Sequence, residues 1–90
     1  MRKQMDQIEN ILVQKLRPTF LALNHDVTTG KSFIHVVVSA KSFNRMNVDE
    51  RIALVFNHLL NSDKDLVEQN TIIVEAFNSS EMADVFEYIK

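Results

Sequence analysis

Residues 32–39 decide the fold of this chain, and they read Ser32-Phe33-Ile34-His35-Val36-Val37-Val38-Ser39. No other run in the sequence holds as many consecutive β-branched and aromatic residues, so this segment predicts a central β-strand. Successive side chains of a strand point to opposite faces, which gives two sets: Phe33, His35 and Val37 on one face, Ile34, Val36 and Val38 on the other. Both faces are largely apolar, so we expect both to be covered.

A helix is predicted after this strand, beyond a loop over residues 40–46. Asn47 is the expected N-cap, because Glu50 stands three residues on and completes a capping box. The helix is expected to run to about Leu60. Its apolar side chains recur at spacings of three and four, which is one face of an α-helix: Ile52, Val55, Phe56 and Leu59.

The segment before the central strand predicts a helix followed by a hairpin. An apolar stripe from about Asp6 ends at Pro18, because the residue before a proline avoids the helical region. Residues 20–23 form a short apolar run, typical of a strand. Residues 24–31 hold the only glycine, Gly30, among polar residues, which indicates a turn between two antiparallel strands.

The segment after the long helix predicts a short helix over residues 64–69, a strand over 71–77 and a last helix capped by Asn78, with Glu81 at the capping-box position. The order is α-β-β-α-α-β-α. We therefore expect an α+β fold with a three-stranded mixed sheet packed by helices. The last strand should run parallel to one of the others after a right-handed crossover.

Composition sets limits on function. The chain has 90 residues, 46% of them hydrophobic and 24% charged, which predicts one globular domain over residues 1–90. The absence of cysteine excludes disulfides, thiolate catalysis and cysteine-based metal sites within the chain. No apolar run reaches the roughly 18 residues of a membrane span, and no secretory signal is visible. We expect a cytoplasmic protein, monomeric or weakly dimeric, that does not bind membranes.

Charge is distributed unevenly along the chain. Residues 1–45 hold seven basic and three acidic side chains, whereas residues 46–90 hold three basic and nine acidic. One group of basic residues surrounds an aromatic side chain after the central strand: Lys41, Phe43, Arg45 and Arg51. This group suits contact with nucleic-acid phosphates or with a protein partner. The alternative is that Phe43 belongs to the core and the basic residues are solvated.

The sequence offers no recognisable catalytic centre. The three histidines, His25, His35 and His58, share no metal-ligand spacing. A chain with one glycine lacks a phosphate-binding glycine loop and a nucleophile elbow. We therefore predict that the protein is not an enzyme and that it has no intrinsic cofactor.

Several segments, taken in order, resemble the BolA family over roughly residues 8–86. The first segments are Leu16-Arg17-Pro18-Thr19-Phe20-Leu21 and residues 33–39. They are followed by Phe43 with Arg51 eight residues later, by Thr71-Ile72-Ile73-Val74, and by Ser80-Glu81-Met82. The resemblance implies an αββααβα domain similar to the type II KH fold. It also implies a non-enzymatic adaptor that docks a monothiol glutaredoxin and acts in iron-sulfur cluster or iron homeostasis.

The resemblance carries a ligand set that this chain only partly matches. BolA-like proteins share a [2Fe-2S] cluster with the glutaredoxin through a histidine just before the third strand, and Asn70 occupies that place here. An amide is a poor iron ligand beside an imidazole. The family's second ligand comes from the hairpin loop, where His25 is the candidate. The chain also has Arg45 in place of a family glycine and Ile52 in place of a histidine.

The sequence thus leaves two functions open. The first is the glutaredoxin-docking adaptor, with a shared cluster held through His25. The alternative is a nucleic-acid-binding regulator of transcription or stress response. It would contact DNA or RNA through Lys41, Arg45 and Arg51 on the KH-like surface.

Overall fold

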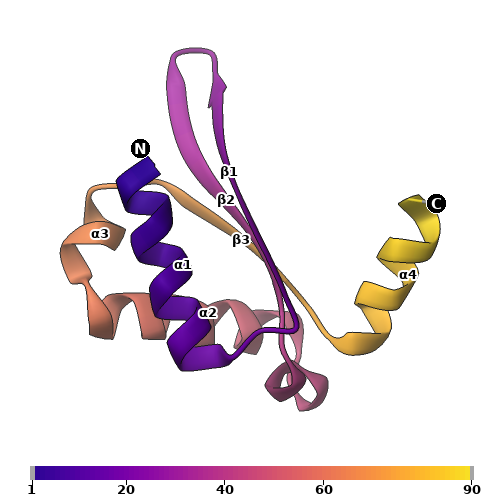
Figure 1. Cartoon of the computed structure of the whole chain (residues 1–90). Coiled ribbons are helices and arrows are strands. Elements are labelled where there is room, and N and C mark those ends of the chain that lie inside the picture. The colour runs from indigo at the N-terminus through magenta and orange to yellow at the C-terminus, as the bar shows by residue number, and fades with distance from the viewer. Residues whose placement is uncertain (1, 90) are drawn as a thin grey trace.

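The computed structural model describes residues 2–89 of the chain, and the side chains of residues 2–84. Its elements follow the predicted order (Figure 1). The helices are α1 (Arg2–Leu16), α2 (Val48–Ser62), α3 (Lys64–Glu68) and α4 (Ser79–Ile89). The strands are β1 (Phe20–Thr28), β2 (Lys31–Ser39) and β3 (Ile72–Phe77), and a 3-10 helix, η1, spans Lys41–Arg45.

The sheet has the order β1-β2-β3, so the predicted central strand is central. β1 pairs with β2 antiparallel, and β3 pairs with β2 parallel, as the crossover between them requires. The α+β class and the three-stranded mixed sheet are therefore confirmed. Both remaining strands have one free edge.

The two faces of the sheet are covered differently. Ile34, Val36 and Val38 are fully buried beneath α1, α2 and α3, which all lie on one side of the sheet (Figure 1). The opposite face, with Phe33, His35 and Val37, is only half-buried. On that side the described part of α4 lies beside Phe20 and Ser39, with which it lines a pocket, at the end of the sheet where β2 and β3 finish; we call this the lower end. Both faces are therefore in contact with helices, as expected, but one is covered much more completely than the other.

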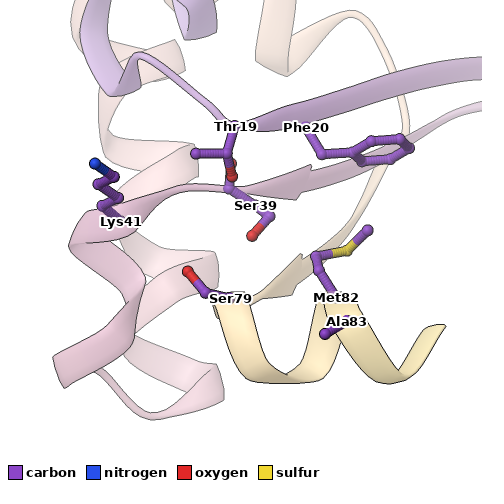
Figure 2. A pocket seen from close by; sticks show the side chains of 7 residues that line it. All are labelled: Thr19, Phe20, Ser39, Lys41, Ser79, Met82 and Ala83. Carbon is purple, nitrogen blue, oxygen red and sulfur yellow. The ribbon is translucent and has the colours of Figure 1, made fainter. Parts of the chain in front are cut away.

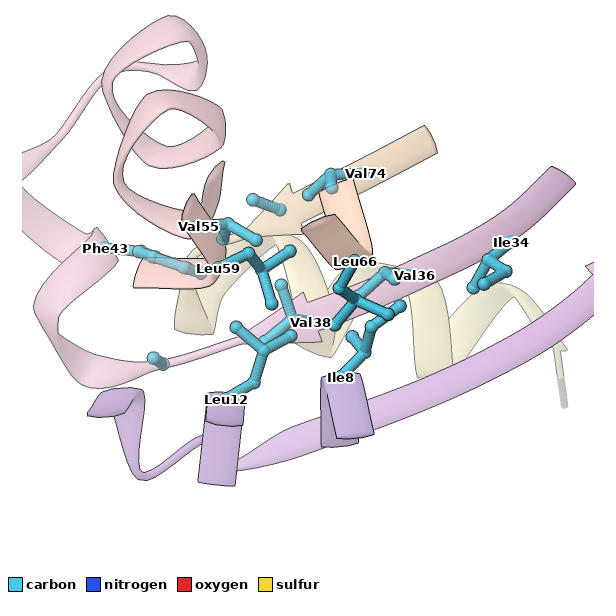
Figure 3. Close-up of a cluster of buried hydrophobic side chains, with 12 residues drawn as sticks. Ile8, Leu12, Ile34, Val36, Val38, Phe43, Val55, Leu59, Leu66 and Val74 are labelled. Atoms are coloured by element: carbon cyan, nitrogen blue, oxygen red, sulfur yellow. The ribbon is translucent and has the colours of Figure 1, made fainter. Parts of the chain in front are cut away.

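One continuous core fills the space between the sheet and the three helices (Figure 3). Its members come from every covering element: Ile8 and Leu12 of α1, Val55 and Leu59 of α2, Leu66 of α3, and Val74 and Ala76 of β3. Phe43 of η1 is fully buried against them. The loop predicted over residues 40–46 is therefore mostly a helical turn that plugs the core with an aromatic side chain.

The hairpin differs from its prediction. Residues 24–28 and 31 belong to the strands, and the turn is only Thr29-Gly30. The pair Thr28–Lys31 closes it, with φ of 50° at Thr29 and 79° at Gly30. Two consecutive positive φ angles make the tight hairpin turn that matches strand twist. Polar residues continue the strands because the hairpin tip projects past the helices, where no apolar face is needed (Figure 1). His25 therefore lies on β1, not in a loop.

Capping decides the helix boundaries. Asn47 and Glu50 form the predicted capping box of α2, with the Asn47 Oδ1 accepting from the Glu50 N–H at 2.9 Å. Asp63 follows α2 directly, and its carboxylate accepts from the Leu66 N–H at 3.2 Å, which starts α3. A single residue thus separates the two helices, and α1 begins at Arg2, earlier than the expected Asp6.

Replacing Phe43 tests whether η1 is part of the core. We expect Phe43→Ala to lower the free energy of unfolding by about 3–5 kcal/mol, since it leaves a cavity under η1. The control is Val13→Ala, at a side chain 48% exposed, which should change it by less than about 0.5 kcal/mol. Urea unfolding followed by circular dichroism measures both. Equal small effects would show that Phe43 is not packed as described.

Replacing Thr29 tests the turn. A β-branched residue at φ of 50° is strained, whereas asparagine tolerates this region. We expect Thr29→Asn to stabilise the fold by about 0.5–1 kcal/mol. Gly30→Ala should destabilise it although no atom lies within 4 Å of the added methyl, because the cost is conformational. Thermal unfolding measures the stability of both variants. Destabilisation by Thr29→Asn together with stabilisation by Gly30→Ala would contradict the described turn.

Candidate functional site

The lower end of the sheet is held by a buried arginine. Arg51 is only 5% exposed, although arginine usually lies at the protein surface. Its Nε donates to the Met46 carbonyl oxygen at 3.0 Å, and its Nη1 donates to the Ala76 carbonyl oxygen at 3.3 Å and to the Glu81 Oε1 at 2.6 Å. We call this group, Arg51 with Met46, Ala76 and Glu81, the Arg51 junction. It ties the end of η1, α2, β3 and α4 together.

Glu81 also caps the start of α4. Its Oε1 accepts from the Asn78 N–H at 2.9 Å, and its own N–H donates to the Asn78 Oδ1 at 2.9 Å, which is the predicted capping box of α4. The hydrogen bond from the Asn78 N–H is the main reason that the pKa of Glu81 lies below its ordinary value of 4.5. Burial opposes this shift, and the hydrogen bond and charge of the Arg51 guanidinium add to it. The carboxylate therefore stays ionised at neutral pH.

The upper end of the sheet, where the hairpin and the start of β3 lie, holds the two positions that the resemblance links to the cluster, His25 and Asn70. His25 lies opposite Ile34 on β1 and β2, and Ile34 lies beside Ile72 of β3. The Ile34 N–H also donates to the Thr71 carbonyl oxygen at 2.9 Å. Two strand spacings separate His25 from the start of β3, roughly 10 Å between backbones. His25 and the Asn70 connection thus share one end of the sheet.

Asn70 is engaged with the helix before it. Its Nδ2 donates to the Leu66 carbonyl oxygen at 2.8 Å and so satisfies a free carbonyl at the end of α3. The side chain is half-buried, whereas His25 is exposed. Among the described residues, no three His, Asp or Glu side chains gather as a metal site.

The four residues predicted to contact nucleic acid or a partner differ in how exposed they are. Lys41 and Arg45 are exposed on η1. Phe43 is fully buried and Arg51 is committed to the junction, so neither reaches a ligand in this structure. The interpretation of Phe43 as a core residue describes its position correctly. Arg51 is neither solvated nor available.

A pocket lies between the strand ends and α4, with a volume of about 330 Å³. Figure 2 shows the hydroxyls of Ser39 and Ser79 facing this space, with Lys41 turned away from both. Ser39 is fully buried, and its Oγ has no hydrogen-bond partner among the described residues. Among the described residues that line the pocket there is no His, Asp or Glu.

Known structures share this arrangement of elements. No family model and no curated protein sequence matches the chain. Among solved structures, BolA1 from Arabidopsis thaliana superposes with a TM-score of 0.70 at 18% identity, over 87% of this chain and 94% of that one. A Bol-like protein from Babesia bovis gives 0.71 at 14% identity, over 88% of each chain. The chain has the BolA fold.

A third structure extends the same result. The BolA domain of SufE1 from Arabidopsis thaliana gives a TM-score of 0.67 at 16% identity, over 84% of this chain and 92% of that domain. The BolA-like resemblance inferred from scattered segments is thereby confirmed at the level of the fold. Within the described residues, no helix of this BolA fold has the length and apolar character to cross a membrane.

The donor set of this BolA-fold chain does not fit the pair of ligands that the resemblance implies. The upper end of the sheet offers one imidazole, His25, and one amide, Asn70, whose nitrogen is already bonded to Leu66. His35 and His58 do not complete it. His35 faces the opposite side of the sheet, where its Nε2 lies 3.2 Å from the Glu75 Oε2, and His58 is on α2.

Some features of these sites could not be expected from the sequence. Three features depend on how distant segments of the chain pack together. They are the His35–Glu75 pair, the unbonded Ser39 hydroxyl and the buried state of Arg51. The one signal available was the capping-box spacing of Asn78 and Glu81, which placed Glu81 at the start of α4 without naming its partner.

Titration of Glu81 tests the Arg51 junction. Its pKa is lower in the folded state, so its contribution to stability is present above about pH 4.5 and is lost as the pH falls through the lowered value. We expect the free energy of unfolding to fall below pH 4.5 in the wild type, and to fall less steeply in Glu81→Gln.

The matched control is Glu68→Gln. Glu68 lies 3.6 Å from Lys64 in an exposed pair, and such pairs contribute about 0–1 kcal/mol. Its pH profile should follow the wild type. Urea unfolding at a series of pH values measures all three proteins. A Glu81→Gln profile parallel to the wild type would contradict the assignment.

Proposed function

We propose that this chain is a non-enzymatic adaptor that docks a monothiol glutaredoxin-type protein and acts in iron-sulfur or iron homeostasis. The BolA fold over more than four fifths of the chain supports the proposal. The observation that carries it is that His25 and the start of β3, which Asn70 precedes, lie at the same end of the sheet, about two strand spacings apart. That is where the resemblance places the ligands facing the partner.

We further propose that docking here does not depend on a stable shared cluster. A [2Fe-2S] centre held by the adaptor through two imidazoles would lose one of them at Asn70. An iron-sulfur cluster bridged by His25 alone would be weakly held. Shape and polar contacts at the projecting hairpin and the α3–β3 connection would then supply the affinity.

The test is co-expression with a monothiol glutaredoxin, co-purification, and visible absorption and circular dichroism spectra. We expect a stoichiometric complex of the wild type without a cluster band. Asn70→His should restore the band, and the double variant Asn70→His with His25→Ala should lose it again. The new histidine forgoes the Leu66 bond, at a cost of about 1 kcal/mol.

The control is Asn10→His, the same change at an exposed position of α1, which should leave the complex colourless. A coloured wild-type complex that His25→Ala bleaches would overturn the cluster-free part of the proposal. No complex with any variant would overturn the adaptor function itself. Light scattering after gel filtration gives the stoichiometry independently of colour.

We do not propose the alternative, a nucleic-acid-binding regulator. KH domains clamp nucleotides with a GXXG loop, and the single glycine of this chain is at the hairpin turn. Lys41 and Arg45 are the exposed basic residues left from the predicted group. Steeply salt-dependent binding of DNA or RNA, weakened by Lys41→Ala and Arg45→Ala, would favour the alternative instead.

A further inference from the structure

β3 is an edge strand whose outer side is partly unbonded. The parallel register and the bond from the Ile34 N–H to the Thr71 carbonyl oxygen fix which groups of β3 face β2. In a parallel pair, the backbone N–H and C=O groups of alternate residues point to the neighbouring strand. The backbone groups of Ile73 and Glu75 therefore face β2, and the backbone groups of Ile72, Val74 and Ala76 face away from it. The Ala76 carbonyl oxygen accepts from Arg51. No described residue bonds to the outward groups of Ile72 and Val74.

A groove runs beside this edge. It has a volume of about 280 Å³ and lies between the start of α2, the strand and the start of α4. Its walls are mainly apolar side chains, namely Val48, Ile52, Val74, Ala76 and Phe77. Val48 is 50% exposed, so the groove is open to an incoming side chain. A free strand edge with an adjoining apolar groove is the arrangement that proteins use to bind an extended peptide.

The charges around the groove select the occupant. Glu75 and Glu81 line it, and Asp49 follows Val48 in the first turn of α2, whereas no described Lys or Arg is among the lining residues. Arg51 pairs with Glu81 at 2.6 Å and offsets its charge, so the excess negative charge beside the groove comes from Glu75 and Asp49. Phosphates would be repelled. A second copy of this chain would place Glu75 near another Glu75, and like charges across strands destabilise pairing.

We propose that the outer edge of β3 binds an extended segment of a partner protein in which apolar residues alternate with Lys or Arg. Alternation follows from the faces of the sheet. Ile72, Val74 and Ala76 face the helices, and Val74 and Ala76 also line the groove, so apolar side chains of an added strand enter there. Glu75 faces the other side, with its side chain 53% exposed, so basic side chains lie beside it.

The probe is an acetylated, amidated hexapeptide, Lys-Val-Lys-Val-Lys-Val, titrated into the ¹⁵N-labelled full chain. We expect shifts of the backbone amides of β3 and of Val48. Hydrogen exchange at the Ile72 and Val74 amides should slow at least tenfold at saturation, because the outward N–H groups acquire acceptors. A peptide with Glu in place of Lys, and one with N-methylated valines, should each bind at least tenfold more weakly.

Two variants of the chain test the two halves of the site. Glu75→Lys removes the charge selection, and Val48→Lys obstructs the groove, and each should weaken binding about tenfold or more. The control is Val27→Lys, the same change on β1, at a side chain 66% exposed on the opposite edge, which should bind as the wild type does. The spectra of all variants show whether they remain folded.

Several results would overturn the proposal. They are the absence of shifts in β3, shifts confined to the hairpin, equal binding of the N-methylated peptide, or preferred binding of the Glu peptide. Dimerisation through this edge, detected by light scattering and abolished by Glu75→Lys, would also overturn it. The proposal stands or falls independently of glutaredoxin docking, which uses the upper end of the sheet.

Discussion

The interaction on which the rest of the structure depends is the Arg51 junction. One guanidinium donates to a carbonyl of the η1–α2 connection, a carbonyl of β3 and the carboxylate that starts α4. A buried charge is costly unless its donors are met, and here three acceptors meet them while the Glu81 side chain keeps 43% of its exposure. Lysine would not match it, because the three bonds come from two separate nitrogens of the guanidinium, Nε and Nη1, whereas lysine has a single ammonium nitrogen.

The junction divides the molecule into two ends with different uses. At the lower end, Arg51 and the capping box of Glu81 close the sheet against α4, which takes Arg51 away from any phosphate. At the upper end the hairpin projects past the helices (Figure 1), and there His25 is exposed and Asn70 half-buried. The bond from Arg51 to Ala76 satisfies one outward carbonyl of the β3 edge. The outward groups of Val74 and Ile72 follow from the register of β3 and have no bond to a described residue.

The sequence predicted the elements well where local physics decides them. The central strand was predicted from its run of β-branched and aromatic residues. The capping boxes at Asn47 and Asn78 were predicted from spacing, and the parallel third strand from the helical crossover before it. The two hairpin strands were predicted too short. Their pairing continues to Thr28 and Lys31 at the two-residue turn, through polar residues that an apolar sequence pattern does not identify. The buried state of Arg51 was missed, because nothing local distinguishes an arginine with three tertiary acceptors from a solvated one. The β3 edge and its groove likewise depend on sheet order, which composition and periodicity do not give.

The most direct test of this account is a double-mutant cycle between Arg51 and Glu81, with Arg51→Met, Glu81→Gln and the double variant unfolded in urea at neutral pH. The account predicts a coupling free energy of about 1–3 kcal/mol, since each residue loses its main partner when the other is replaced. The equivalent cycle between Lys64 and Glu68 should give less than about 0.5 kcal/mol. Additive effects of Arg51 and Glu81, within about 0.5 kcal/mol, would contradict the claim that this pair holds the lower end of the sheet together.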